Sequence, residues 1–183
     1  NRWANIDPLK RTERPDIPEL NPAFYGFSDG DMDIVFNISN TYFGKSTMTL
    51  RDLLQALRET YCGTIGAEVM YISDQKIKKW WQEKLESIRS TPNFNVVERR
   101  QILDRVTAAE GLERYLQAKY VGQKRFSLEG GESFIASMDE LIRGAGIKGI
   151  QEIVVGMAHR GRLNILVNVL GKMPKDLFAE FEH

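Results

Sequence analysis

The sequence predicts an α/β fold, with a helical N-terminal portion followed by the first βαβ units of a domain with a parallel sheet. Apolar residues recur with helical spacing between Thr47 and Tyr120. After Lys124, short apolar runs alternate with amphipathic segments. Such alternation is typical of parallel sheets with right-handed crossovers. We therefore expect three parts, at residues 1–46, 47–122 and 123–183.

Residues 1–46 are predicted to form an extended, proline-rich arm. Four of the chain's six prolines lie among its first 30 residues: Pro8, Pro15, Pro18 and Pro22. Proline has no N–H to donate, so it disfavours helix interiors and sheet ladders. Aromatic side chains normally need burial, and we expect those of this stretch to dock the arm on a folded body: Trp3, Phe24, Tyr25 and Phe27.

Residues 47–122 are predicted to be helical. One helix follows an N-cap within 47–49, and a second follows a cap at Ser73 and ends before Pro92. The third is a long helical pattern from 96 to 120. Trp80 and Trp81 lie at helical positions in the second helix, where we expect them to be part of a core rather than a ligand platform.

Residues 123–183 are predicted to begin an α/β domain. Short strands are expected at 125–128 and 153–155, separated by a helix over 134–143. Gly144 and Gly146 are expected to end that helix. Another helical pattern starts at residue 163, so the order is strand, helix, strand, helix.

The end of the second predicted strand carries the candidate site. In open α/β sheets, ligands bind outside the carboxyl ends of the strands. His159 lies there, with Arg160 next to it and Arg162 two residues further on. An imidazole beside guanidinium groups suits an anionic ligand that also needs a proton donor or acceptor. The alternatives are a capping or core histidine and a solvated basic surface.

A second candidate segment follows the first predicted strand. If the two strands are neighbours in one parallel sheet, their carboxyl ends lie at the same edge. Glu129, Gly130 and Gly131 would then approach His159, because glycine permits tight turns and close backbone approach. A single Gly-Gly pair is weak evidence by itself.

Composition excludes several classes of function. Lys and Arg together number 25, as do Asp and Glu, so the formal net charge is zero. The chain therefore has no general electrostatic attraction to nucleic acid. One cysteine and two histidines, His159 and His183, offer no metal-ligand spacing, so no metal site is expected. No apolar run approaches the roughly 20 residues that span a bilayer, so no membrane span is expected.

At these residues the sequence resembles a known family. KRFSLEGGESFI, from Lys124, and GMAHRGRLNILVNVLGK, from Gly156, strongly resemble the thiamine diphosphate-dependent 2-oxoglutarate dehydrogenases. RWANIDPL, AFYGFSD and LRDLLQALRETYCGTIGAEVMYISD resemble the family's region before its catalytic domain. The resemblance spans essentially the whole chain. It implies an internal N-terminal piece of a longer polypeptide, in which 123–183 begins the thiamine diphosphate-binding domain.

The resemblance also implies roles for individual residues. It makes His159 a catalytic residue that lines the active site and helps to bind and process the 2-oxo acid. Arg125 and Phe126 correspond to residues that approach the active centre, Arg125 as a cofactor contact and Phe126 as a substrate contact. Arg160 is a candidate contact to a cofactor or substrate anion. The family's metal and diphosphate motif has no counterpart in this sequence.

The implied enzyme decarboxylates 2-oxoglutarate on thiamine diphosphate and Mg²⁺ in the tricarboxylic acid cycle. It passes the succinyl group to the lipoyl arm of dihydrolipoamide succinyltransferase, in a complex that also contains dihydrolipoamide dehydrogenase. The resemblance implies a homodimer, in the cytoplasm of a bacterium or the mitochondrial matrix of a eukaryote. We expect the 183 residues alone to be inactive.

Three alternatives stay open at this point. One is a close relative that acts on 2-oxoadipate. Another is a non-catalytic helical interaction module, with Trp80, Trp81 and the aromatic arm as its docking surface. The third is a regulatory domain that binds an anion at Arg160 and Arg162.

Overall fold

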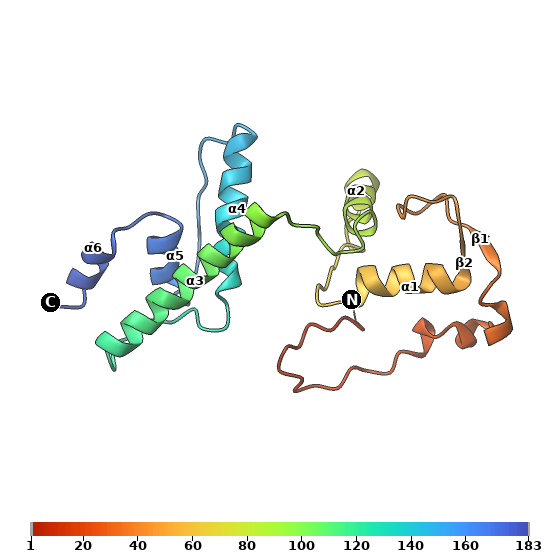
Figure 1. The fold of residues 1–183 in the computed structure, drawn as a ribbon, viewed down its shortest axis with the longest axis horizontal. Helices are drawn as coiled ribbons and strands as arrows, with labels where there is room; N and C mark the ends of the chain where they lie inside the picture. Colours follow the sequence, from red (N-terminus) through yellow and green to blue (C-terminus); the bar gives the residue numbers. More distant parts are fainter. Residues whose placement is uncertain (1, 183) are drawn as a thin grey trace. The chain divides into compact units, whose positions relative to one another are not determined.

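A computed structural model describes residues 2–182 of the chain. They form two compact units, one up to Asn93 and one from Phe94 onward (Figure 1). The boundary lies inside the predicted helical region, so the long third helix shares a unit with the predicted strands. His183 lies outside the described residues.

The first unit contains the only sheet among the described residues. Strands β1 (Val35–Asn37) and β2 (Thr47–Thr49) pair antiparallel, with Phe36 opposite Met48. Before them the chain forms three short 3₁₀ helices at Pro18–Leu20, Pro22–Tyr25 and Asp29–Asp31. Proline suits the first position of such a turn, because its fixed φ matches and its missing N–H would have no partner.

Two helices complete the first unit. α1 (Leu50–Tyr61) is capped by Thr49, whose side chain accepts a hydrogen bond from the Asp52 N–H at 3.1 Å. α2 (Gln75–Glu86) is capped by Asp74 rather than by the predicted Ser73, because the Asp74 carboxylate accepts from two N–H groups of the first turn. The small core contains six residues: Ile38, Met48 and Ala56, with Phe36, Phe43 and Leu53 packed against them.

The tryptophan pair of α2 differs from the prediction. Trp80 and Trp81 are 50% and 40% exposed, so they do not belong to the core of this unit. Their rings meet edge to face, with centroids 5.0 Å apart. Because Trp80 and Trp81 are adjacent in α2, their side chains point in different directions around the helix axis, and one buried face cannot cover both. The buried residue of α2 is Glu86, at the end of the helix.

The second unit is helical. α3 (Val96–Lys119) contacts both α4 (Ser133–Ile147) and α5 (Arg162–Asn168), and α6 (Pro174–Ala179) packs on α5. A reciprocal capping box between Asn95 and Glu98 begins α3, which confirms the predicted start at residue 96. The core of the unit contains Ala109, Leu128, Ile135 and Ile165.

The end of α4 corrects a prediction. The helix continues through Gly144 and Gly146 as far as Ile147. Glycine inside a helix costs only about 1 kcal/mol relative to alanine, so it does not end a helix by itself. The left-handed residue that follows the helix is Gly149, with φ of +84°.

The predicted parallel sheet is not seen in the described residues. Segments 125–128 and 153–155 are irregular, and Figure 1 shows the latter as coil between α4 and α5. A strand exists only when a neighbour completes its ladder of hydrogen bonds. Residues 2–182 place no such neighbour beside Val154, which is 96% exposed. The helical portion of the prediction is confirmed.

Candidate functional site

The two candidate loops, residues 125–131 (the first loop) and 156–161 (the second loop), meet in the second unit. The Gly161 N–H donates to the Phe126 carbonyl oxygen at 2.7 Å. The Arg160 Nη2 donates to the Glu129 carbonyl oxygen at 2.9 Å. The rings of Phe126 and His159 lie with centroids 4.3 Å apart and planes tilted by 38°. The loops are therefore neighbours without a sheet between the segments that precede them.

Backbone geometry explains why glycine stands between the two arginines. Gly161 has φ of +75°, a conformation that L side chains rarely adopt. A Cβ at this position would lie 2.6 Å from Leu128 Cδ1, well inside van der Waals contact. Gly161 therefore allows the second loop to lie directly against Leu128, the core residue in the first loop.

Phe126 also has unusual geometry. Its φ is +45°, in a region that a bulky residue without glycine's freedom normally avoids. Strain of this kind persists only where the surroundings determine the conformation, and it occurs often at binding sites. The Phe126 ring is 48% exposed, and His159 and Arg160 are exposed beside it. The three side chains thus offer an aromatic surface, an imidazole and a guanidinium to a ligand from solvent.

Arg125 is held by two carboxylates. Its Nη1 lies 3.1 Å from Glu113 Oε2, and its Nη2 lies 3.2 Å from Glu129 Oε1. The Arg125 side chain is 17% exposed. Its positive charge is therefore balanced within the protein, and its role as a cofactor contact stays a prediction.

Glu113 is the residue that sequence reasoning missed. It lies on α3, is only 3% exposed, and accepts hydrogen bonds from Leu128 N at 2.9 Å and Asn164 Nδ2 at 3.1 Å. The signal was present in the helix: Ala109, Glu113 and Leu116 follow the spacing of one helix face, and all three are buried. A glutamate on a buried helix face needs hydrogen-bond donors around its carboxylate. Here those donors come from the residues that carry the two loops of the site.

Asn164 connects the second loop to the same support. It lies on α5 and is fully buried. Its Nδ2 also donates to the Ala109 carbonyl oxygen at 2.9 Å, and its Oδ1 accepts from Asn168 Nδ2 at 2.7 Å. The amide therefore has partners at both ends, as buried polar groups require.

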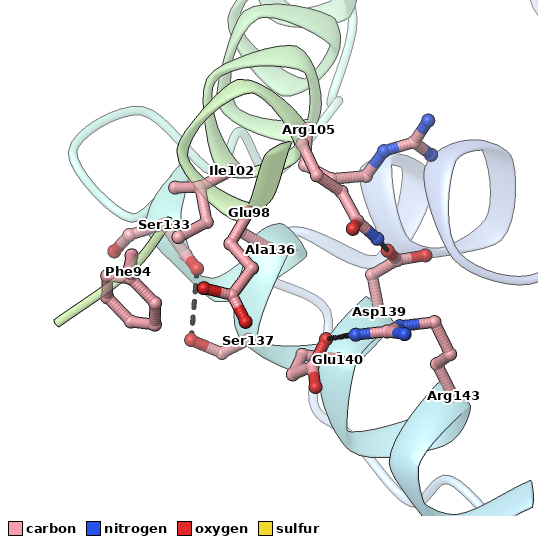
Figure 2. Close-up of a pocket in the computed structure, with 11 residues that line it drawn as sticks. Phe94, Glu98, Ile102, Arg105, Ser133, Ala136, Ser137, Asp139, Glu140 and Arg143 are labelled. Carbon is pink, nitrogen blue, oxygen red and sulfur yellow. Dashed lines mark hydrogen bonds and ion pairs between the residues drawn. The ribbon is translucent and has the colours of Figure 1, made fainter. Parts of the chain in front are cut away.

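A separate cavity of about 310 Å³ lies between α3 and α4 (Figure 2). Phe94, Ile102 and Ala136 form its apolar part, and Gln101 donates to Asp139 at 3.4 Å on its rim. Arg143 pairs with Glu140 there, as Figure 2 shows. None of the predicted site residues lines this cavity.

The described residues contain neither a cluster of metal ligands nor a membrane-spanning helix. Within residues 2–182, no group of three or more His, Cys, Asp or Glu side chains is arranged to hold a metal ion. In the same residues, every helix is too short or too polar to cross a membrane.

Comparison with known proteins gives matches along essentially the whole of this chain. No protein-family model matches the chain. It is 72% identical over 182 residues to a 2-oxoglutarate dehydrogenase E1 component from Cupriavidus necator, covering 100% of this chain and 19% of that protein. It is 49% identical to proteins of the same name from Azotobacter vinelandii, over 98% of this chain and 19% of that protein, and Haemophilus influenzae, over 97% and 19%.

The chain spans about one fifth of the length of the curated relatives that it matches. The aligned stretch includes both candidate loops, because it covers essentially the whole chain. The resemblance seen in the sequence is therefore confirmed: from end to end, this chain is related to the 2-oxoglutarate dehydrogenase E1 components.

Proposed function

We propose that the protein carrying this chain is a thiamine diphosphate-dependent 2-oxoglutarate dehydrogenase. The proposal rests on one observation above the others. Phe126 and His159, to which the family resemblance assigns site roles, have ring centroids 4.3 Å apart although 33 positions separate them in the sequence. The 72% identity to a relative of this name supports the same function.

The substrate carries two carboxylates and a ketone, and the site has groups suited to them. Arg160 uses one nitrogen on the Glu129 carbonyl, and its other N–H groups are available to a carboxylate because the side chain is exposed. His159 can donate or accept a proton at the ketone oxygen or carboxylate. Phe126 presents an apolar surface beside both groups, which excludes water when a ligand covers it.

The residues present fit part of a cofactor site. When bound, thiamine diphosphate supplies the nucleophile and electron sink for decarboxylation. Arg160 is the exposed cation that would meet its diphosphate or the substrate anion. Arg125, the other proposed cofactor contact, is paired with Glu113 and Glu129 and would reach the cofactor only when its pair with Glu129 opens. Residues 2–182 contain no cluster suited to Mg²⁺. We therefore assign no metal ligand to this segment.

The proposed partners follow the family. We infer a homodimer that transfers succinyl to the lipoyl group of dihydrolipoamide succinyltransferase, with dihydrolipoamide dehydrogenase completing the complex. Because the matched relatives are bacterial, we infer a cytoplasmic location.

The test uses the full-length polypeptide and the His159→Ala variant. We expect wild type to release CO₂ from 2-oxoglutarate in the presence of thiamine diphosphate and Mg²⁺, and to prefer 2-oxoglutarate over 2-oxoadipate. His159→Ala should lower kcat/KM by at least about tenfold while the free energy of unfolding changes by less than about 1 kcal/mol, because His159 is exposed.

Two results would contradict this proposal. One is a wild-type protein without 2-oxoglutarate-dependent CO₂ release. The other is a His159→Ala variant that loses stability and keeps wild-type kinetics in its folded fraction, which would make His159 a structural residue. The isolated 183-residue chain should be inactive in the same assay.

A further inference from the structure

We propose that Glu113 is a positioning residue for the 2-oxo acid site. It touches none of the exposed site side chains, yet it holds the backbone on which Phe126 and His159 lie. The inference rests on the proposed function, and it adds a buried residue of α3 to a site formed by two loops.

The Glu113 carboxylate collects donors from separate parts of the chain. Oε2 pairs with Arg125 at 3.1 Å. Oε1 accepts from the Leu128 N–H at 2.9 Å and from Asn164 Nδ2 at 3.1 Å. Two of these donors belong to the first loop and the third belongs to α5, which follows the second loop directly. A single carboxylate is therefore hydrogen-bonded to the first loop and to the helix that follows the second loop.

These bonds enclose the strained residue. Arg125 and Leu128 lie on either side of Phe126, whose φ of +45° needs support from its neighbours. On the other segment, Asn164 lies three residues after Gly161, whose N–H donates to the Phe126 carbonyl. Moving the Glu113 carboxylate would therefore shift both partners of the Phe126–His159 contact.

The position of Glu113 gives these bonds their strength. The residue is 3% exposed, so its hydrogen bonds operate with little competition from water. Arg125 has a second carboxylate partner, Glu129, but that side chain is 49% exposed and belongs to the loop itself rather than to α3. Glu113 connects the loop to α3 by hydrogen bonds, in addition to the packing of Leu128 with Ala109.

The test compares Glu113→Gln with Glu110→Gln in the full-length enzyme. Both positions are glutamates of α3 paired with an arginine, but the Glu110 pair with Arg114 is exposed on the helix surface. In Glu113→Gln, an NH₂ group replaces one of the two carboxylate oxygens, so a donor faces one of the N–H groups that Glu113 accepts from. We expect KM for 2-oxoglutarate to rise several-fold and kcat/KM to fall by about tenfold to a hundredfold, as for a misplacement of about 1 Å.

The change in KM separates positioning from folding. A variant that merely folds less well has fewer active molecules, so its apparent kcat falls while KM stays at the wild-type value. Glu113→Asp, which keeps the charge, should recover part of the lost kcat/KM. Glu110→Gln should match wild type in both constants.

Asn164→Ala provides a second variant if Glu113→Gln does not fold. It removes one donor to Glu113 and leaves the pair with Arg125 intact, so we expect a smaller rise in KM in the same direction. Wild-type KM in the folded variants would overturn the positioning role. An inactive wild-type enzyme would instead overturn the proposed function, so the two failures are distinguishable.

Discussion

Each unit of the molecule buries one glutamate on a helix, and the two glutamates have different partners. In the first unit, Glu86 of α2 is 6% exposed and accepts from Tyr61 Oη at 2.7 Å and Tyr42 N at 2.8 Å. In the second unit, Glu113 of α3 is 3% exposed and accepts from a guanidinium as well as from amides. The first set of donors is neutral, and the second includes a cation.

The difference indicates what each buried carboxylate does. Glu86 connects α2 to the end of α1 and to the loop between the strands, so it holds elements of the unit's own fold. Glu113 connects α3 to two loops whose exposed side chains face solvent. Glu113 is buried and Arg125 is partly buried, so removing either one leaves the other charge less well paired.

The largest expected effect comes from removing each carboxylate. Glu113→Ala leaves the Arg125 charge with only its exposed partner, and we expect a loss of about 3 to 5 kcal/mol in the free energy of unfolding. Glu86→Ala leaves neutral donors without acceptors, and we expect about 2 kcal/mol. Urea denaturation of the two variants measures both values. Equal losses would remove the distinction between the two glutamates.

A smaller effect is expected at Gly161. Alanine there must adopt a positive φ and must also displace Leu128, so we expect Gly161→Ala to cost about 2 to 3 kcal/mol. Gly171 has φ of +74° and nothing within 4 Å of a built Cβ, so it is a matched control. Gly171→Ala should cost about 1 kcal/mol, from backbone strain alone. Thermal unfolding of both variants checks the difference, and equal shifts in Tm would show that Leu128 yields easily.

The smallest effect is a pH dependence in the first unit. Burial, followed by the hydrogen bond to Glu86, raises the pKa of Tyr61 above its ordinary value of 10.0. The folded state therefore disfavours the phenolate, so this stability is present below pH 10 and is lost as the pH rises toward the folded-state pKa.

Tyr61→Phe isolates that contribution. Near neutral pH the variant should be less stable by about 1 kcal/mol, the value of one hydrogen bond. Between pH 9 and pH 11, about the range in which an unfolded tyrosine ionises, its unfolding free energy should fall less steeply than that of wild type. Parallel curves for the two proteins would mean that Tyr61 ionises freely in the folded state.

How far the sequence predicts the fold depends on whether a pattern is local. The sequence predicts the long α3 to within one residue at its end, because its apolar spacing is a local signal. The strands at 125–128 and 153–155 were not found, because a strand depends on neighbours that the pattern does not contain. The helix continues through Gly144 because the helix-propensity cost of one glycine is small.

The same reasoning applies to the site. The approach of Glu129 to His159 is predicted for two strands that share one parallel sheet. Residues 2–182 contain no such sheet, yet Arg160 Nη2 donates to the Glu129 carbonyl oxygen. The contacts of Glu113 were not expected, because a glutamate on a helix is usually solvated and only its buried neighbours reveal otherwise. The roles of His159, Arg125, Phe126 and Arg160 remain predictions from the family resemblance.

The central claim is that the two loops act as one substrate site, and a double-mutant cycle tests it most directly. Phe126→Ala, His159→Ala and the double variant are made in the full-length enzyme, and kcat/KM for 2-oxoglutarate is measured for each. Because the two rings touch at 4.3 Å, we expect the effects to be non-additive by about 1 kcal/mol or more. Strictly additive effects would contradict the claim, since they would mean that the two residues serve the reaction independently.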